Sequence, residues 1–89
     1  MKAVISVVGK DRTGILAFVS TYCAQRDINI EDVTQKVLQD IFTMIMIVDI
    51  PQGPDNFRRT ADELEELGNE QMLKIHVMHE DIFNAMHTI

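Results

Sequence analysis

Basic residues, cysteine and tryptophan are scarce in this sequence. The eight Lys and Arg residues are scattered among fourteen Asp and Glu residues, and the formal charge at pH 7 is −6. A nucleic-acid partner is therefore not expected, because phosphate binding relies on clustered Lys and Arg. The single cysteine, Cys23, excludes an internal disulfide and a Cys-x-x-Cys site, and its apolar neighbours favour a buried structural thiol.

Long apolar runs and catalytic motifs are missing as well. Residues 41–50 form the longest apolar stretch, which is too short to span a bilayer, so no membrane partner is expected. No signal peptide precedes the first predicted strand, and we expect a cytoplasmic location. Neither a nucleophile elbow nor a phosphate-binding glycine-rich loop is present. We therefore predict no catalytic residues, no cofactor and no enzymatic activity.

The sequence does contain enough apolar material for one small folded domain. Apolar residues make up 46% of the 89 residues, and no low-complexity run interrupts them. A domain of this size buries only roughly 60–65% of the surface that its unfolded chain exposes. Self-association would therefore add useful burial.

Hydrophobic periodicity predicts an alternation of strands and helices. The expected elements are strand 2–8, helix 15–26, strands 28–38 and 41–50, a helix from Asp55 or Asn56 to Gly68-Asn69, strand 71–79 and tail helix 81–89. A change of parity near Glu31-Asp32 indicates a bulge. This β-α-β-β-α-β order predicts an α+β, ferredoxin-like plait, with a four-stranded antiparallel sheet, two helices on one face and a short C-terminal helix. We expect a domain over residues 1–80 and a tail over 81–89 that packs on the domain or on a dimer partner.

The third predicted strand is apolar on both faces. Ile41, Ile45 and Ile47 share one face, whereas Phe42, Met44, Met46, Val48 and Ile50 share the other. One layer of helices covers only one face of a sheet, so a second subunit or the tail must cover the other. We therefore predict a homodimer, with an open sheet face that carries methionine and other apolar groups.

Two glycines flank the junction between the first strand and the first helix. Gly9 and Gly14 permit close approach of a ligand to the backbone, and the first helical turn leaves N–H groups that favour a carboxylate. An acidic side chain nearby complements an ammonium group, so an amino acid or a similar zwitterion is the expected ligand. Structural roles remain open here, since Asp11 can cap the helix, Gly14 can serve packing and Arg12 can be solvated.

The same segment carries a family resemblance. Residues 9–16, Gly-Lys-Asp-Arg-Thr-Gly-Ile-Leu, resemble the G-x-D-[RK]-[PS]-G-[IL]-[LV] pattern of the ACT domain, a small-molecule-sensing module of amino-acid metabolism. Residues 27–32 resemble the G-x-N-I entry to its second strand. The likeness covers residues 1 to about 80 and extends to small bacterial and archaeal single-domain proteins and, more distantly, to the glycine cleavage system repressor. Thr13 replaces the commoner proline, and Gly9 stands where some serine-binding members have histidine.

This resemblance implies a ligand site shared between two domains. The ligand-binding residues that it implies are Gly9, Lys10, Asp11, Arg12, Thr13, Gly14, Ile15, Asn29 and Ile30. Asp11 would bind a ligand amine, the backbone from Arg12 to Ile15 would receive a carboxylate, and Asn29 would reach in from the partner copy. The chain would then regulate a partner protein in trans. The alternative is an assembly module that binds a protein through its apolar sheet face and tail, with no small ligand.

The histidines do not form a metal-ligand pattern. Strand alternation places His76 and His79 on opposite sides of the sheet, and His87 follows eight residues after His79. Glu80 and Asp81 have a simpler role as the acidic start of the tail helix. We predict no metal site.

Overall fold

Four strands and three helices make up the computed structural model, which describes residues 1–53 and 55–87, the last two by their backbone alone. The strands are β1 (Lys2–Lys10), β2 (Asn29–Leu38), β3 (Ile41–Asp49) and β4 (Leu73–His79), and the helices are α1 (Ile15–Gln25), α2 (Asn56–Glu70) and α3 (Glu80–His87). The predicted element order is confirmed. Pro54 of the predicted loop and Ile89 of the predicted tail helix lie outside the described residues.

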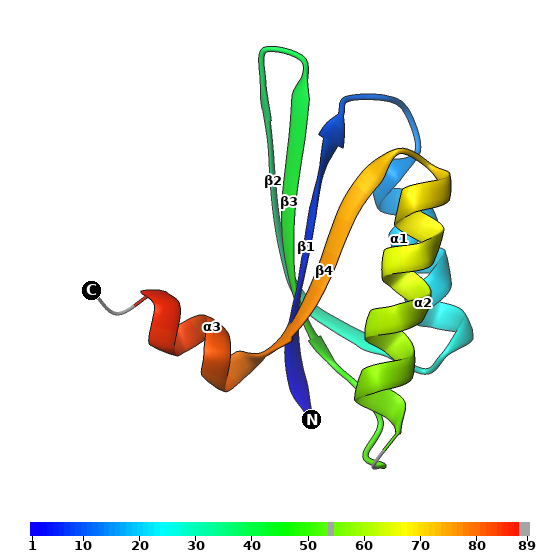
Figure 1. Cartoon of the computed structure of the whole chain (residues 1–89), viewed down its shortest axis with the longest axis vertical. Helices are drawn as coiled ribbons and strands as arrows, with labels where there is room; N and C mark the ends of the chain where they lie inside the picture. The colour runs from blue at the N-terminus through cyan, green and yellow to red at the C-terminus, as the bar shows by residue number, and fades with distance from the viewer. Residues whose placement is uncertain (54, 88–89) are drawn as a thin grey trace.

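The strands form one antiparallel sheet in the order β2-β3-β1-β4. Helices α1 and α2 lie together on one side of the strands, and α3 lies on the opposite side (Figure 1). Two β-α-β units therefore interleave, which confirms the predicted ferredoxin-like plait. Figure 1 also shows that the β1–α1 loop and the β2–β3 hairpin lie at one end of the sheet, while the N-terminus lies at the other.

The main core lies between the sheet and the two long helices. Met44 and Met46 are fully buried there, so the prediction that methionine would line the open face is wrong. The physical reason is the register, which places these methionines beside Ile5 and Val7 of β1, on the face where the neighbouring strands are also apolar. The open face of β3 carries Ile41, Ile45 and Ile47 instead.

Local details of β2 agree with the sequence pattern. The register between β2 and β3 shifts between Ile30 and Asp32, which confirms a bulge at Glu31. The predicted hairpin is also present, and Gln39 adopts a positive φ of 57° in it although no glycine is available.

Helix α2 ends later than predicted. Gly68 and Asn69 do not terminate the helix, which continues to Glu70. Gly68 is buried, and a methyl group at this position would lie 2.7 Å from Cγ1 of Ile75 and 3.0 Å from the carbonyl oxygen of Leu73. The glycine is therefore required for close packing of α2 on β4 rather than for a helix stop.

A polar cluster connects α1 to α2. The Tyr22 hydroxyl donates a hydrogen bond of 2.6 Å to Oε1 of Glu63, and the guanidinium of Arg26 lies 5.0 Å from the Tyr22 ring centre. Burial, together with the hydrogen bond to Glu63 and the charge of Glu63, raises the pKa of Tyr22 to about 12. The hydrogen bond from Tyr22 is the main cause that lowers the pKa of Glu63.

Replacing Gly68 with valine tests the packing of α2 on β4. We expect Gly68→Val to lower the free energy of unfolding by about 1–3 kcal/mol, because the added methyl groups overpack the contact with Ile75. Urea denaturation measures the change. The neighbouring Asn69 is exposed, and Asn69→Val should change stability by only about 0.5 kcal/mol. Equal effects of the two substitutions would contradict the packing role.

The pKa of Tyr22 can be measured directly, because this residue is the only tyrosine and there is no tryptophan. We expect tyrosinate absorbance to rise with a midpoint near pH 12 in the folded protein, above the ordinary value of 10.0. Because the folded pKa is the higher one, the contribution of Tyr22 to stability is complete below about pH 10 and is lost towards pH 12.

The control for this titration uses two glutamates of α2. Glu63→Gln should lower the Tyr22 midpoint by removing the nearby negative charge, whereas Glu65→Gln on the exposed side should leave it unchanged. Circular dichroism at each pH verifies that the chain is folded. A midpoint near pH 10 in the folded wild type would refute the assignment.

Candidate functional site

Strand β1 is longer than the sequence suggests. Gly9 and Lys10 belong to β1 rather than to the loop, which corrects the boundary predicted at residue 8. A methyl group at Gly9 would lie 2.5 Å from Cδ2 of Leu73, so this glycine lets β4 approach β1 closely. Gly9 thus has a packing role that is independent of any ligand.

Gly14 immediately precedes α1 and has a different role. Its φ of 93° lies in the left-handed region, and its carbonyl oxygen accepts the first helical hydrogen bond from the N–H of Phe18 at 2.9 Å. A methyl group here would contact no heavy atom within 4 Å, so packing does not explain this glycine. No side chain of a described residue caps α1, and the alternative that Asp11 caps it is therefore wrong. Among the described residues, no side chain accepts a hydrogen bond from the first-turn N–H groups of α1.

Hydrogen bonds from Asp11 and Arg12 hold the loop between β1 and α1. The N–H of Asp11 donates to the carbonyl oxygen of Asp40 in the hairpin turn at 2.7 Å. Nη2 of Arg12 donates to Oε1 of Gln71 at 2.8 Å, so this exposed arginine is fixed to the turn before β4. The carboxylate of Asp11 is exposed and accepts no hydrogen bond from any described residue.

Two surface hollows border the loop. One has a volume of about 560 Å³ and is lined by Lys10, Asp11, Arg12, Glu70, Gln71 and Met72. The other, about 440 Å³, is lined by Gly14, Ala17, Phe18, Thr21, Tyr22, Gln25 and Leu67. Asp11 and Gly14 therefore open onto different hollows. Ile15 is 2% exposed and packs in the core, so only its backbone can reach a ligand, whereas Thr13 is exposed.

Asn29 and Ile30 lie far from the loop within one copy. Asn29 pairs with Asp49, which pairs in turn with Lys2 at the start of β1. The loop follows the other end of β1, eight residue steps away, which is about 27 Å at the usual strand rise. Ile30 packs partly against the core. A single copy therefore does not bring Asn29 to the loop.

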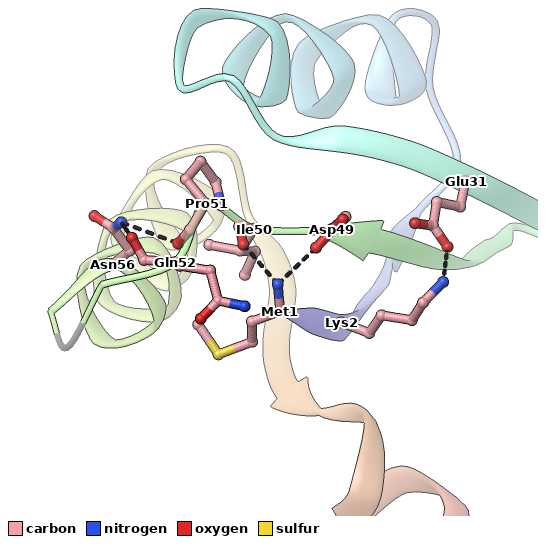
Figure 2. A network of polar contacts seen from close by, with 8 residues as sticks. All are labelled: Met1, Lys2, Glu31, Asp49, Ile50, Pro51, Gln52 and Asn56. Atoms are coloured by element: carbon pink, nitrogen blue, oxygen red, sulfur yellow. Dashed lines mark hydrogen bonds and ion pairs between the residues drawn. The ribbon is translucent and has the colours of Figure 1, made fainter.

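The surroundings of Asn29 are shaped by the N-terminus. The ammonium group of Met1 donates hydrogen bonds to Oδ1 of Asp49 at 2.6 Å and to the carbonyl oxygen of Ile50 at 2.9 Å (Figure 2). The hydrogen bond from the Met1 ammonium group to Asp49, reinforced by the positive charge of that group, lowers the pKa of Asp49. Asn56 donates to the carbonyl oxygens of residues 51 and 52, both at 3.0 Å, which holds the adjacent turn. A hollow of about 250 Å³ lies beside Asn29 here.

A further crevice was not anticipated from the sequence. It has a volume of about 230 Å³, lies beside the Tyr22–Glu63 contact, and includes Arg26, Asp27 and Arg59 in its lining. Arg26 and Asp27 follow the end of α1, whereas Arg59 lies in α2, so spacing in the sequence does not reveal the crevice. The available signal is Arg26, which follows Tyr22 by one helical turn and can therefore lie over its ring.

His76 and His79 lie apart. His76 pairs with Ser6 on the open face, while His79 pairs with Ala3 and its ring centre lies 6.2 Å from that of Phe57. The side chain of His87 lies outside the described residues. In the described part of the chain, no three His, Cys, Asp or Glu residues gather where they could hold a metal ion. Nor is any described helix both long and apolar enough to cross a bilayer.

Comparisons with known proteins place this geometry in a family. A family model described as "ACT domain" matches residues 2–78. A UPF0237 protein of the archaeon Methanococcus maripaludis is 48% identical over 86 residues, which is 97% of this chain and 96% of the relative.

Two solved structures extend the match. An ACT domain protein from Streptococcus pneumoniae superposes with a TM-score of 0.83 at 41% identity and covers 98% of both chains. A putative glycine cleavage system transcriptional repressor superposes with a TM-score of 0.74 at 30% identity. The match covers 85% of this chain and 43% of the repressor chain. By these matches this chain belongs to the ACT domain family and, within it, to the small UPF0237 proteins of bacteria and archaea.

Proposed function

We propose that this chain is a non-enzymatic regulatory protein that binds an amino acid or a similar small zwitterion between two copies of itself. The observation that carries the proposal is the open start of α1. Within the described part of the chain no side chain caps this helix, and the space where a side chain of Gly14 would lie is open. Such a helix start favours a ligand carboxylate.

The carboxylate of Asp11, beside the start of α1, would bind the ammonium group of the ligand. The free carboxylate of Asp11 lies in a loop that is fixed by its own N–H and by Arg12. A fixed loop reduces the conformational entropy that binding would cost. Because Asp11 and Gly14 line different hollows in one copy, the ligand would bridge the loop rather than fill either hollow alone.

A second copy would complete the site. Asn29 lies at the far end of the sheet, so two copies arranged antiparallel would bring Asn29 of one copy to the loop of the other. ACT domains generally bind small ligands for regulation, and this family membership supports the same role here. The bound dimer would then act in trans on a partner protein.

A thermal-shift screen of amino acids tests the proposal. We expect at least one to stabilise the protein, because a ligand at 100 times its dissociation constant adds about 2.7 kcal/mol. For a domain of this size the melting temperature should rise by at least about 10 °C. Asp11→Asn should remove the shift, whereas Asp62→Asn on the exposed side of α2 should retain it. A flat response across all amino acids would refute the sensor role.

A mixing experiment tests whether the site is shared. Asp11→Asn and Asn29→Ala variants should each fail to bind alone. A mixed dimer of the two variants should recover one of its two sites. In that site the intact loop of the Asn29→Ala copy meets the intact Asn29 of the Asp11→Asn copy. Absence of recovery would place both residues in the site of a single copy or exclude them from it.

The alternative function is a protein–protein assembly module with no small ligand. The exposed side chains of Val8, Ile41 and Ile45 on the open sheet face favour this candidate. Gly14→Val separates the two functions, because a sensor would lose its ligand whereas an assembly module would keep its partner.

A further inference from the structure

A groove separates the two long helices. Every residue of α1 and α2 is described, and no Cα atom of one helix lies within 8 Å of a Cα atom of the other. Helices in direct contact have axes about 8–10 Å apart, which brings their nearest Cα atoms closer than this. Two hollows, of about 440 Å³ and about 270 Å³, open between the helices, and Tyr22 of α1 and Leu67 of α2 line both. The two hollows therefore adjoin, and we call them together the interhelical groove.

The α1 wall of the interhelical groove is uncharged. No Asp, Glu, Lys or Arg occurs from Ile15 to Gln25. Ala17 and Thr21 are exposed along this wall, and Phe18 is only partly buried against the core. The solvent side of a surface helix ordinarily carries charged and polar side chains. The α1 wall is therefore suited to contact with apolar side chains.

The α2 wall of the groove is acidic. Glu63, Glu66 and Glu70 line it, and α2 contains no Lys or Arg after Arg59. Glu63 is paired with Arg26, whereas neither Glu66 nor Glu70 forms an ion pair with a described residue. Two carboxylates in the groove are thus left without a cation from the described part of the chain.

These carboxylates oppose the stability of the helix that carries them. Glu66 lies four residues from both Asp62 and Glu70, and like charges at this spacing repel each other. The C-terminal end of a helix is also the negative end of its dipole, and the last turn of α2 has no basic residue. Folding alone therefore does not explain the cluster, whereas a cationic partner beside the apolar α1 wall would.

We propose that the interhelical groove binds a basic amphipathic helix of a partner protein, with its apolar side chains on the α1 wall and its Lys or Arg side chains beside Glu66 and Glu70. Helix-in-groove recognition uses apolar side chains at three- and four-residue spacing. The 11 residues of α1 span about 16 Å, which accommodates about three turns of a bound helix. The inference names a partner surface for the proposed trans-acting role, but it does not rest on a bound amino acid.

A second copy of this chain fits the groove less well than a basic partner does. The sequences of α1 and α3 contain no Lys or Arg, and α2 contains only Arg58 and Arg59. Packing two copies through this groove would bring two acidic α2 helices together. Charge complementarity therefore favours a different protein as the occupant.

A designed peptide tests the acidic wall. The probe is an amphipathic helix of leucine and lysine, about 14 residues long, with one tryptophan. Because this chain has no tryptophan, the fluorescence reports the peptide alone. We expect the peptide to bind, and Glu66→Lys and Glu70→Lys should each weaken binding about tenfold by exchanging an attraction for a repulsion.

Two controls accompany this measurement. Glu65→Lys makes the same change of charge at an exposed residue that lines neither hollow, so binding should stay within about twofold of the wild type. The same peptide with glutamate in place of lysine should not bind. Equal effects of the three glutamate substitutions, or binding of the acidic peptide, would overturn the inference.

The apolar wall is tested with two neighbouring residues of α1. Ala17→Gln places a neutral polar side chain in the groove and should weaken peptide binding about tenfold. Leu16 is 36% exposed but lines neither hollow, so Leu16→Gln should leave binding within about twofold. Circular dichroism verifies that each variant is folded. Equal losses would indicate adsorption to any exposed apolar side chain and would overturn the inference.

The cost of the acidic wall is measured without the peptide. Glu66→Lys should raise the melting temperature of the isolated chain by about 2–5 °C, because it removes repulsion within α2 and complements the helix dipole. A lower melting temperature would show that this carboxylate serves the fold itself, and would overturn the inference.

The remaining outcomes separate the groove from the proposed amino-acid site. Failure of the wild type to bind the peptide would overturn this inference whatever the amino-acid screen shows. A change of sedimentation coefficient in Glu70→Lys without peptide would overturn it by identifying the groove as a contact between copies. The expected peptide results together with a flat amino-acid screen would support the groove and contradict the sensor role.

Discussion

The two long helices cover only one face of a sheet whose central strand β3 is apolar on both, and the rest of the structure follows from this mismatch. On the covered face, Met44 and Met46 fill the space between the sheet and the helices. On the other face, α3 contacts β1 and β4, and the isoleucines nearer the hairpin stay in contact with water. A domain of this size has little hydrophobic burial in reserve, so an uncovered half-face is a substantial loss of stabilisation.

Close approach of β4 is a second constraint that connects the core to the loop. Gly9 and Gly68 lack side chains where Leu73 and Ile75 press against β1 and α2. The turn before β4 is thereby held beside the β1–α1 loop, where Arg12 reaches it. The loop is therefore positioned by backbone packing, while Gly14 alone supplies the left-handed conformation that starts α1 without a capping side chain.

Periodicity in the sequence was sufficient to predict the element order, the plait and the bulge at Glu31, because alternation and helical spacing are local properties. The later end of α2 was missed because Gly68 resembles a helix stop, and only the contact with β4 reveals its packing role. For the site, the loop could be located from its glycines and acidic residue. The separation of Asn29 from the loop depends on strand pairing, and the crevice beside Tyr22 depends on helix packing, so neither follows from spacing.

The bulge at Glu31 also limits how this protein can aggregate. Strand β2 is an edge of the sheet, and unpaired edges template the addition of further strands. The irregular register at Ile30–Asp32 interrupts that template near the start of the strand, and Lys36 places a charge in the regular part that follows. A fibril that grew along this edge would have to accommodate a lysine in every added strand. The charge of Lys36 therefore disfavours aggregation through the exposed backbone of β2.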